Sequence, residues 1–351
     1  MFWVVYYSLF LYFLYLTKKT RNAHVPLLFL MIFFLGQRWM TGEDFPGYLL
    51  YYLIDFKGVD IGFFALQDTF KYFDFSFSLF VLFIYTVTLS LTYKFINKFQ
   101  YASLVFVVFS ITELSFIQLS QLKQSLAIPF MLFSYYYFYN KKYLYGLVFI
   151  VFSSSLHVAS FFLLPFLFFR VPVKKSTMML LLAIVCVLPF LNITAIVPTS
   201  LYFKFGHYLD SEYNQSLSLF HYFKLYGIII IFYILYRSNS MDSLLDKRLI
   251  LSGMFIYIFL YSLSFQFAPF MRFSYFFRVF EVIALINLAM DSNIRRCFSY
   301  YVFPFYSLSF LVICILDPYN VSRYSFEPVR FFEHRTDSQL YLEIDKFYEE
   351  K

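Results

Sequence analysis

The sequence predicts an all-α polytopic integral membrane protein with about twelve membrane segments. Hydrophobic residues make up 61% of the 351 positions and charged residues only 14%, whereas soluble domains carry about 25% charged residues. Long apolar stretches recur along the chain without alternating strand patterns, and a helix needs about 20 such residues to cross a bilayer. We therefore expect a single transmembrane helical domain over residues 1–316 and an extracytoplasmic tail over residues 317–351.

The first half of the chain contains five apolar stretches, and groups of two or three Lys and Arg residues follow the first, the third and the fifth. The stretches lie at about residues 2–16, 24–37, 77–93, 101–119 and 122–139. Because cytoplasmic loops carry an excess of Lys and Arg, the N-terminus is expected outside, with an uncleaved first helix. Residues 42–75 mix apolar and charged side chains and are expected to lie on the outer surface of the bilayer.

Residues Tyr143 to Phe169 have basic neighbours at both ends, so both ends are expected in the cytoplasm. Two full crossings do not fit, since each arm of about 13 residues reaches about 20 Å, against a hydrocarbon core of about 30 Å. We expect a short membrane hairpin whose polar tip, Ser153 to His157, lies partway into the membrane. The alternative is one long tilted helix, which would invert every later segment.

Five further segments complete the expected topology, at about residues 177–193, 219–236, 249–267, 273–290 and 298–316. The net charge is +7, but the basic residues form short clusters between apolar runs. Such clusters set membrane orientation, so no nucleic-acid partner is expected. The three cysteines, Cys186, Cys297 and Cys314, have no paired spacing and indicate neither a disulfide framework nor a metal site.

Ionisable residues near the spans concentrate on the predicted outer side. They are Arg38, Glu43, Asp44, Lys123, His157, Arg272 and Arg278. Because such residues are costly in or near a membrane, they mark a candidate functional site. The cations outnumber the carboxylates, which favours an anionic ligand such as a phosphate or diphosphate.

Arg38, Gly42, Asp44 and Tyr48 form the pattern R-x-x-x-G-x-D-x-x-x-Y directly after a predicted span. The Arg38 guanidinium can form paired hydrogen bonds with phosphate oxygens, and the Asp44 carboxylate can accept a proton. The alternative is that Arg38 reaches from a helix end to the lipid headgroups, followed by a turn at Gly42.

Two further motifs lie on the outer side. Gln121, Lys123 and Gln124 stand at the start of a span, where the alternative to ligand binding is helix-start hydrogen bonding and a headgroup contact. His157 stands beside three serines at the hairpin tip. An imidazole there can act as a base or as a neutral hydrogen-bonding group, or it can be a buried structural residue.

Arg272 and Arg278 flank the outer start of a later span. Six residues of α-helix turn about 600°, which leaves the two side chains about 120° apart, so they need not share one ligand. His24, His207, His221 and His334 lack metal-ligand spacing, and no glycine-rich phosphate loop, HExxH or GxSxG motif is present. We expect no metal and no cofactor.

Together these motifs resemble the EpsG-like family of polysaccharide polymerases, which includes many Wzy-type O-antigen and capsule polymerases. The family pattern has R-x-x-x-G-x-D-x-x-x-Y after a span, then Q-x-R-Q, then F-H-x-S/A in a hydrophobic hairpin, and a late Arg before a Tyr-rich span. The corresponding residues are Arg38, Gly42, Asp44 and Tyr48; Gln121, Lys123 and Gln124; Leu156, His157 and Ala159; and Arg272 with Tyr275. Lys123 and Leu156 depart from the family's usual Arg and Phe, and Glu43 adds a carboxylate.

The resemblance implies a membrane glycosyltransferase without a nucleotide-sugar donor. It would transfer a growing glycan from a polyprenyl diphosphate carrier to the next lipid-linked repeat unit, at the outer face of the cytoplasmic membrane. The implied partners are polyprenyl diphosphate-linked oligosaccharides, membrane lipid and a chain-length regulator protein. One alternative function is transport of lipid-linked oligosaccharide, for which paired charges near the membrane midplane and internal repeats are expected. Another is an O-antigen ligase, which shares the donor chemistry and differs only in its acceptor.

Such a reaction needs cations at the leaving diphosphate and a base at the attacking hydroxyl. We assign the diphosphate to Arg38 and Arg272, with Lys123 assisting. The base is expected to be Asp44 or His157, with Glu43 as a further candidate. The remaining expected substrate-binding residues are Tyr48, Gln121, Gln124 and Arg278.

Overall fold

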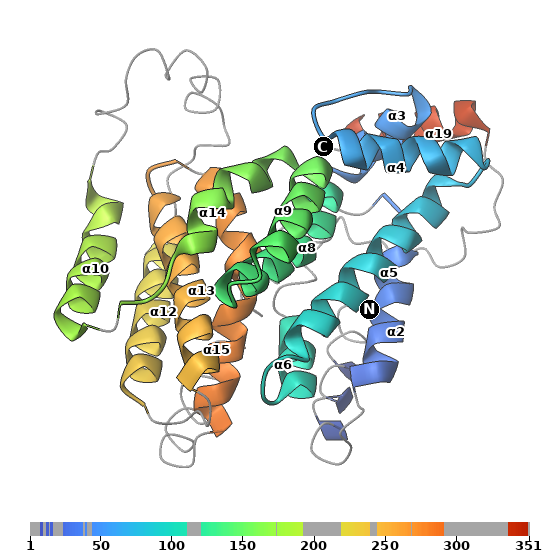
Figure 1. The fold of residues 1–351 in the computed structure, drawn as a ribbon. Helices are drawn as coiled ribbons and strands as arrows, with labels where there is room; N and C mark the ends of the chain where they lie inside the picture. Colours follow the sequence, from blue (N-terminus) through green and yellow to red (C-terminus); the bar gives the residue numbers. More distant parts are fainter. Residues whose placement is uncertain are drawn as a thin grey trace. The chain divides into compact units, whose positions relative to one another are not determined.

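The structure is a computed structural model and describes most of the chain (Figure 1). The described residues are 8–9, 12–13, 15–16, 24–37, 39–40, 44–110, 121–172, 174–191, 219–238, 244–267, 269–290 and 336–349. Over these ranges the chain forms helices and no strands, which confirms the all-α prediction. It divides into two compact units: unit 1 comprises residues 1–134, 147–161 and 296–351, and unit 2 comprises residues 135–146 and 162–295.

Unit 1 begins with helices that pack around a buried histidine. Its first helices are α2 (His24–Gly36), α3 (Phe45–Leu53), α4 (Ile61–Tyr72), α5 (Phe77–Ile96) and α6 (Ala102–Phe109). Helix α2 packs against α5 and α6. The His24 ring stacks on Tyr93 at 4.4 Å and shares hydrogen bonds with the Tyr93 hydroxyl at 2.5 Å and with Ser103 at 2.7 Å. His24 is therefore a core residue whose polar atoms are satisfied.

The segment predicted to lie on the membrane surface, residues 42–75, forms two short helices, α3 and α4, over its described part. Helix α19 (Asp337–Glu349), from the predicted C-terminal tail, packs against α3. The indole Nε1 of Trp39 donates a hydrogen bond to Glu343 in α19 at 2.6 Å. These contacts make α3, α4 and α19 parts of unit 1; their position relative to a bilayer stays a prediction.

The predicted hairpin is present as two short arms after α8 (Leu122–Tyr139). The arms are α9 (Tyr143–Leu156) and the 3-10 helix η2 (Val158–Phe168), and they are separated at His157. The Phe138 ring lies 5.8 Å from Tyr143 at the start of the first arm and 5.1 Å from Phe168 at the end of the second. The chain therefore reverses direction at the tip. By their residue counts the arms are about 21 and 22 Å long.

Unit 2 is built around α13. Its elements are α10 (Lys175–Val187), η3 (Leu188–Phe190), α12 (Leu219–Arg237), α13 (Leu244–Leu263), α14 (Pro269–Ser274), η6 (Tyr275–Phe277) and α15 (Val279–Met290). Helices α12, α13 and α15 pack side by side, and α13 also contacts α10 and α14 (Figure 1). Nearly every described side chain of α13 from Leu249 to Ser262 is buried, so this helix forms the centre of the unit.

The predicted segment at residues 273–290 is helical but bent. The chain bends by 47° where η6 meets α15, close to Arg278. By length and composition one described helix, Phe77–Ile96, could cross a membrane, and the bent pair reaches that length only when it is counted as one span. The count of about twelve segments is therefore not confirmed. The predicted segment 298–316 and most of 2–16 lie outside the described residues.

Gly253 allows α13 and α15 to pack closely. A Cβ at this position would lie 2.3 Å from the ring of Phe280, which is fully buried. We expect Gly253→Ala to destabilise the protein by about 1–3 kcal/mol through overpacking. A lowered thermal unfolding midpoint in detergent would show this.

Gly227→Ala in α12 is the matched control. No described atom outside that helix's own backbone lies within 4 Å of the Cβ it would add. This variant is expected to be neutral or stabilising by up to about 1 kcal/mol. Equal midpoints for both alanine variants would contradict the close approach of α13 and α15.

Candidate functional site

Three distant parts of unit 1 meet at Asp60, the residue before α4. Its side chain is 9% exposed. Oδ2 accepts a hydrogen bond from Lys123 Nζ at 3.0 Å, and Oδ1 accepts one from the Val158 amide at 2.8 Å. His157 Nδ1 lies 3.7 Å from Oδ1. We call Asp60, Lys123 and His157 the Asp60 centre.

Asp60 occupies a helix N-cap position but does not cap its own helix. Aspartate at this position ordinarily accepts a hydrogen bond from the first turn that follows, and Asp60 makes no such bond to α4. It binds instead the amide of Val158, the first residue of η2. Because the first amides of a helix lack partners within that helix, Asp60 caps the second arm of the hairpin from a different part of the chain.

The hairpin tip is also held by small residues. Ser153 donates a hydrogen bond to the carbonyl oxygen of Ala127 in α8 at 2.9 Å. A Cβ on Gly62 would lie 2.5 Å from the Ser155 hydroxyl oxygen and 3.0 Å from the Ser155 main chain. Gly62 therefore lets the first turn of α4 approach the tip closely, which brings Asp60 to His157.

Lys123 lies among four aromatic rings. Its Nζ is 4.4 Å from the ring centre of Phe64 and 5.4 to 5.8 Å from those of Phe63, Tyr51 and Tyr48. The side chain is 14% exposed. Aromatic faces attract a cation, the more so where water is excluded. The rings and Asp60 together hold the ammonium group of Lys123 in place.

The carboxyl of Asp60 stays ionised at neutral pH. Burial by itself would raise its pKa, but His157, the Val158 amide and Lys123 act in the opposite direction and hold the pKa of Asp60 well below its usual range. The carboxylate therefore carries a full negative charge that pairs with Lys123 and faces one nitrogen of His157.

This arrangement can position a base. With Nδ1 of His157 facing a carboxylate, the other ring nitrogen, Nε2, lies on the opposite edge of the ring. The side chain is 24% exposed, so it is not sealed inside the unit. At 3.7 Å the contact is electrostatic and longer than a hydrogen bond; a carboxylate this close favours a proton on the nitrogen that faces it and leaves the other nitrogen available for proton transfer.

The structure brings together some of the predicted site residues. Tyr48, Lys123 and His157 meet at the Asp60 centre, whereas Arg38 and Glu43 lie outside the described residues. Asp44 precedes α3 and is part-exposed. Among the described residues, Asp44 is not one of the partners of Asp60.

Two predicted glutamines flank Lys123 and face the interior. The side-chain oxygen of Gln121 is buried and has no hydrogen-bond partner within the described part of the chain. Gln124 is 2% exposed. Gln121 itself is part-exposed, and its main-chain carbonyl accepts a hydrogen bond from the Ser125 amide at 2.8 Å, as a helix-start residue does.

Arg272 and Arg278 belong to unit 2 and are described with it. Arg272 is exposed on α14, and Arg278 lies at the bend, 5.9 Å from the Tyr275 ring. A turn of 3-10 helix, η6, separates them. The angle of about 120° expected for one continuous α-helix therefore does not apply.

Sequence reasoning missed Asp60 and a second buried acid, Glu281. Glu281 in α15 is fully buried, and neither carboxylate oxygen has a hydrogen-bond partner of normal geometry among the described residues. Lys224 and Arg278 interact with it electrostatically. A carboxylate three residues after Arg278 inside an apolar run is a signal that could have identified it.

Comparison with known proteins gives one match. The model of the EpsG family matches residues 22–326. No curated protein and no solved structure matches significantly. The matched range includes every residue of the Asp60 centre.

The low pKa of Asp60 predicts how stability depends on pH. Asp60→Asn is expected to destabilise the protein by about 1.5–3 kcal/mol at neutral pH, the range for a hydrogen bond to a charged group. The carboxylate stabilises the fold above its unfolded pKa of about 3.9, and this stabilisation is lost as the pH falls through the lower folded pKa. The difference between wild type and Asp60→Asn in thermal midpoint should therefore be constant above about pH 5 and shrink below about pH 4.

Asp68→Asn provides the control for this measurement. Asp68 is 46% exposed and pairs with Lys57 on the outer face of α4. Exposed pairs contribute about 0–1 kcal/mol, so this variant is expected to melt close to wild type. A difference for Asp60→Asn no larger than that for Asp68→Asn would be inconsistent with a stabilising Asp60 centre.

Proposed function

Because the chain belongs to the EpsG family, a family of Wzy-like polysaccharide polymerase-type membrane proteins, we propose that it polymerises lipid-linked oligosaccharide repeat units. A hydroxyl of the next repeat unit attacks the anomeric carbon of the growing glycan. The bond from that carbon to the polyprenyl diphosphate breaks, and the diphosphate leaves with the bonding electrons. The glycan grows by one repeat unit, and the hydroxyl proton passes to a base.

The observation that carries this proposal is the Asp60 centre. Lys123 and His157 come from two different motifs of the sequence and meet at one carboxylate, and Tyr48, from a third motif, lies with its ring centre 5.8 Å from the Lys123 ammonium. A base that accepts the proton of an attacking hydroxyl must be oriented and within reach of a substrate. His157 is part-exposed, and its Nδ1 lies 3.7 Å from the Asp60 carboxylate, which supports the proposal that it is this base.

We assign His157 as the base and Asp60 as the residue that orients it. Lys123 positions Asp60, because its ammonium is engaged by the carboxylate and by aromatic rings. This differs from the direct role at the diphosphate that the sequence suggested for Lys123. The cations for the leaving diphosphate remain Arg38 and Arg272, with Arg278 as a further candidate.

We place the reaction at the outer face of the bacterial cytoplasmic membrane, where the motif residues lie in the expected topology. Its substrates are polyprenyl diphosphate-linked oligosaccharides, and a chain-length regulator protein is the expected partner. The product is an O antigen or a related surface polysaccharide.

A surface-glycan gel tests the proposal. A strain that lacks the gene is expected to show a single-repeat band in place of the ladder, and the intact protein restores the ladder. His157→Ala at normal protein levels should not restore it, since removing a general base lowers rates by about 100-fold or more. Loss of every repeat, including the first, in the deletion strain would indicate transport or ligation.

Lys57→Ala is the matched control for the gel. Lys57 lies in the same segment as Asp60 and makes an exposed ion pair with Asp68. This variant is expected to restore a normal ladder. If His157→Ala and Lys57→Ala gave the same ladder, His157 would have no role in polymerisation.

Two substitutions at Lys123 separate its charge from its size. Lys123→Arg keeps a cation that can pair with Asp60 and stack on the rings, and it is expected to restore the ladder. Lys123→Met keeps a long apolar side chain without the charge and is expected to shorten the glycan or abolish the ladder. Protein level and thermal midpoint are measured for both, and equal ladders would exclude a role for the Lys123 charge.

A further inference from the structure

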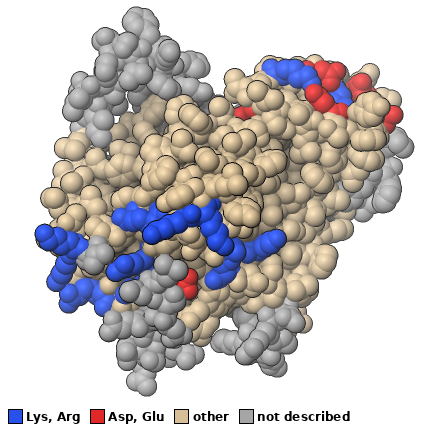
Figure 2. Space-filling model, in the orientation of Figure 1, with Lys and Arg blue, Asp and Glu red and all other residues tan. Residues whose placement is uncertain are grey.

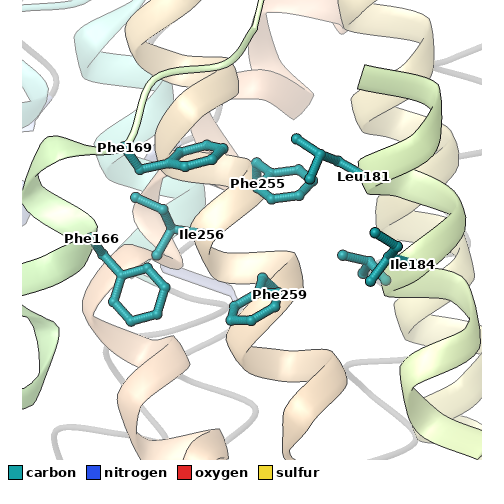
Figure 3. Close-up of a pocket in the computed structure, with 8 residues that line it drawn as sticks. Phe166, Phe169, Leu181, Ile184, Phe255, Ile256 and Phe259 are labelled. Atoms are coloured by element: carbon teal, nitrogen blue, oxygen red, sulfur yellow. The ribbon is translucent and has the colours of Figure 1, made fainter. Parts of the chain in front are cut away.

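Unit 2 contains an apolar cavity between η2, α10 and α13 (Figure 3). Its volume is about 190 Å³. The lining is wholly apolar and comprises Phe166, Phe169, Leu181, Ile184, Val185, Phe255, Ile256 and Phe259. The cavity is partly open, so an apolar group can enter it from outside, and its walls gain dispersion contacts when one does.

Two contacts show how η2 and the following residues run along α13. Val171 donates its main-chain hydrogen bond to the Ser252 hydroxyl at 3.0 Å. The rings of Phe166 and Phe259 lie 5.9 Å apart. From the first contact to the second, residue numbers decrease from 171 to 166 along η2 and the residues after it, but increase from 252 to 259 along α13. The two segments therefore run antiparallel.

Helix α10 runs parallel to α13 on the other side of the cavity. Ser262 donates a hydrogen bond to the carbonyl oxygen of Val185 at 2.8 Å. Further along, Gln266 donates one to that of Leu188 at 3.2 Å. The start of α10, the start of α13 and the end of η2 therefore lie at the same end of unit 2.

All three walls carry basic residues at that end. Arg170 follows η2, Lys174 and Lys175 begin α10, and Lys247 and Arg248 lie near the start of α13. Lys174 and Lys175 are exposed and Arg248 is part-exposed. Arg170 donates hydrogen bonds to three main-chain carbonyl oxygens, and Lys247 to two, so the phosphate site rests on the other three cations. Figure 2 shows Lys and Arg side chains gathered in a band with few acidic side chains beside it.

On α10 and α13 the cavity lies within about one leaflet of the basic ends, and Phe169, which also lines it, is the residue next to Arg170. Phe255 is about 10 Å along α13 from Arg248, and Phe259 is about 16 Å from it. On α10, Leu181 is about 9 Å from Lys175. Half of a hydrocarbon core is about 15 Å thick, so the cavity spans the depth of the acyl chains in the leaflet that faces the basic ends.

We propose that this cavity binds one acyl chain of an anionic glycerophospholipid whose phosphate lies among the basic residues. Basic sites between helices select anionic headgroups over neutral ones. By the positive-inside rule this leaflet is the cytoplasmic one, opposite to the proposed reaction. The lipid is therefore a resident of the protein and not its substrate, and it fills the space between α10 and the rest of unit 2.

Lipid binding to the purified full-length protein tests this site. Delipidated protein in detergent is titrated with phosphatidylglycerol or phosphatidylcholine of the same chains, and bound lipids are counted by native mass spectrometry. We expect phosphatidylglycerol to bind at least about tenfold more tightly and to raise the thermal midpoint. Equal binding of the two lipids would overturn the proposal.

Adjacent substitutions on α10 locate the acyl chain. Leu181→Trp fills the cavity and is expected to abolish high-affinity binding of phosphatidylglycerol. Leu180→Trp is the control, because Leu180 does not line the cavity and is 62% exposed. Wild-type binding by Leu181→Trp would overturn the assignment of the cavity.

Charge variants test the same site if Leu181→Trp does not fold. Lys174→Gln, Lys175→Gln and Arg248→Gln together leave the cavity lining intact and are expected to weaken binding about tenfold. Lys94→Gln is the control and should bind as wild type, because Lys94 is an exposed residue of α5 in unit 1. Displacement of phosphatidylglycerol by polyprenyl phosphate would overturn the proposal in favour of a prenyl chain. These readouts do not use polymer formation, so they stand apart from the proposed function.

Discussion

The negative charge of Asp60 is the constraint on which the architecture of unit 1 depends. A carboxylate that is 9% exposed requires compensating partners. They come from 63 residues away in α8 and 98 residues away in the hairpin. The bond from the Val158 amide also fixes the hairpin tip, which places Nδ1 of His157 3.7 Å from the carboxylate. Stability and the candidate chemistry therefore rest on one side chain, and neither can be altered there without altering the other.

Much of the helical structure could be predicted from the sequence because membrane helices are defined by local properties. The expected segment at residues 122–139 coincides with α8, and the segment at 24–37 ends within one residue of α2. The hairpin followed from lengths and from basic residues at both ends of Tyr143 to Phe169. These signals depend only on neighbouring residues in the chain, so no knowledge of packing was needed.

The site was less predictable because its contacts are long-range. Asp60 looked like one of several acids in a surface segment, and an aspartate before a helix suggests local capping. Its actual partners, Lys123 and the Val158 amide, carry no sequence pattern that points to it. The bend near Arg278 was also missed, since the apolar run continues through it and the burial of Phe276 and Phe277 beside it is a tertiary property.

The hydrogen bond between Trp39 and Glu343 has a consequence for biosynthesis. The two residues are 304 positions apart, and a ribosome adds residues at about 5–20 per second. Trp39 is therefore made about 15 to 60 seconds before its acceptor. The early helices of unit 1 are therefore made first and remain without this contact while α19 is still being translated. A chain stopped before Asp337 lacks this closing contact, so completion of translation is coupled to completion of unit 1.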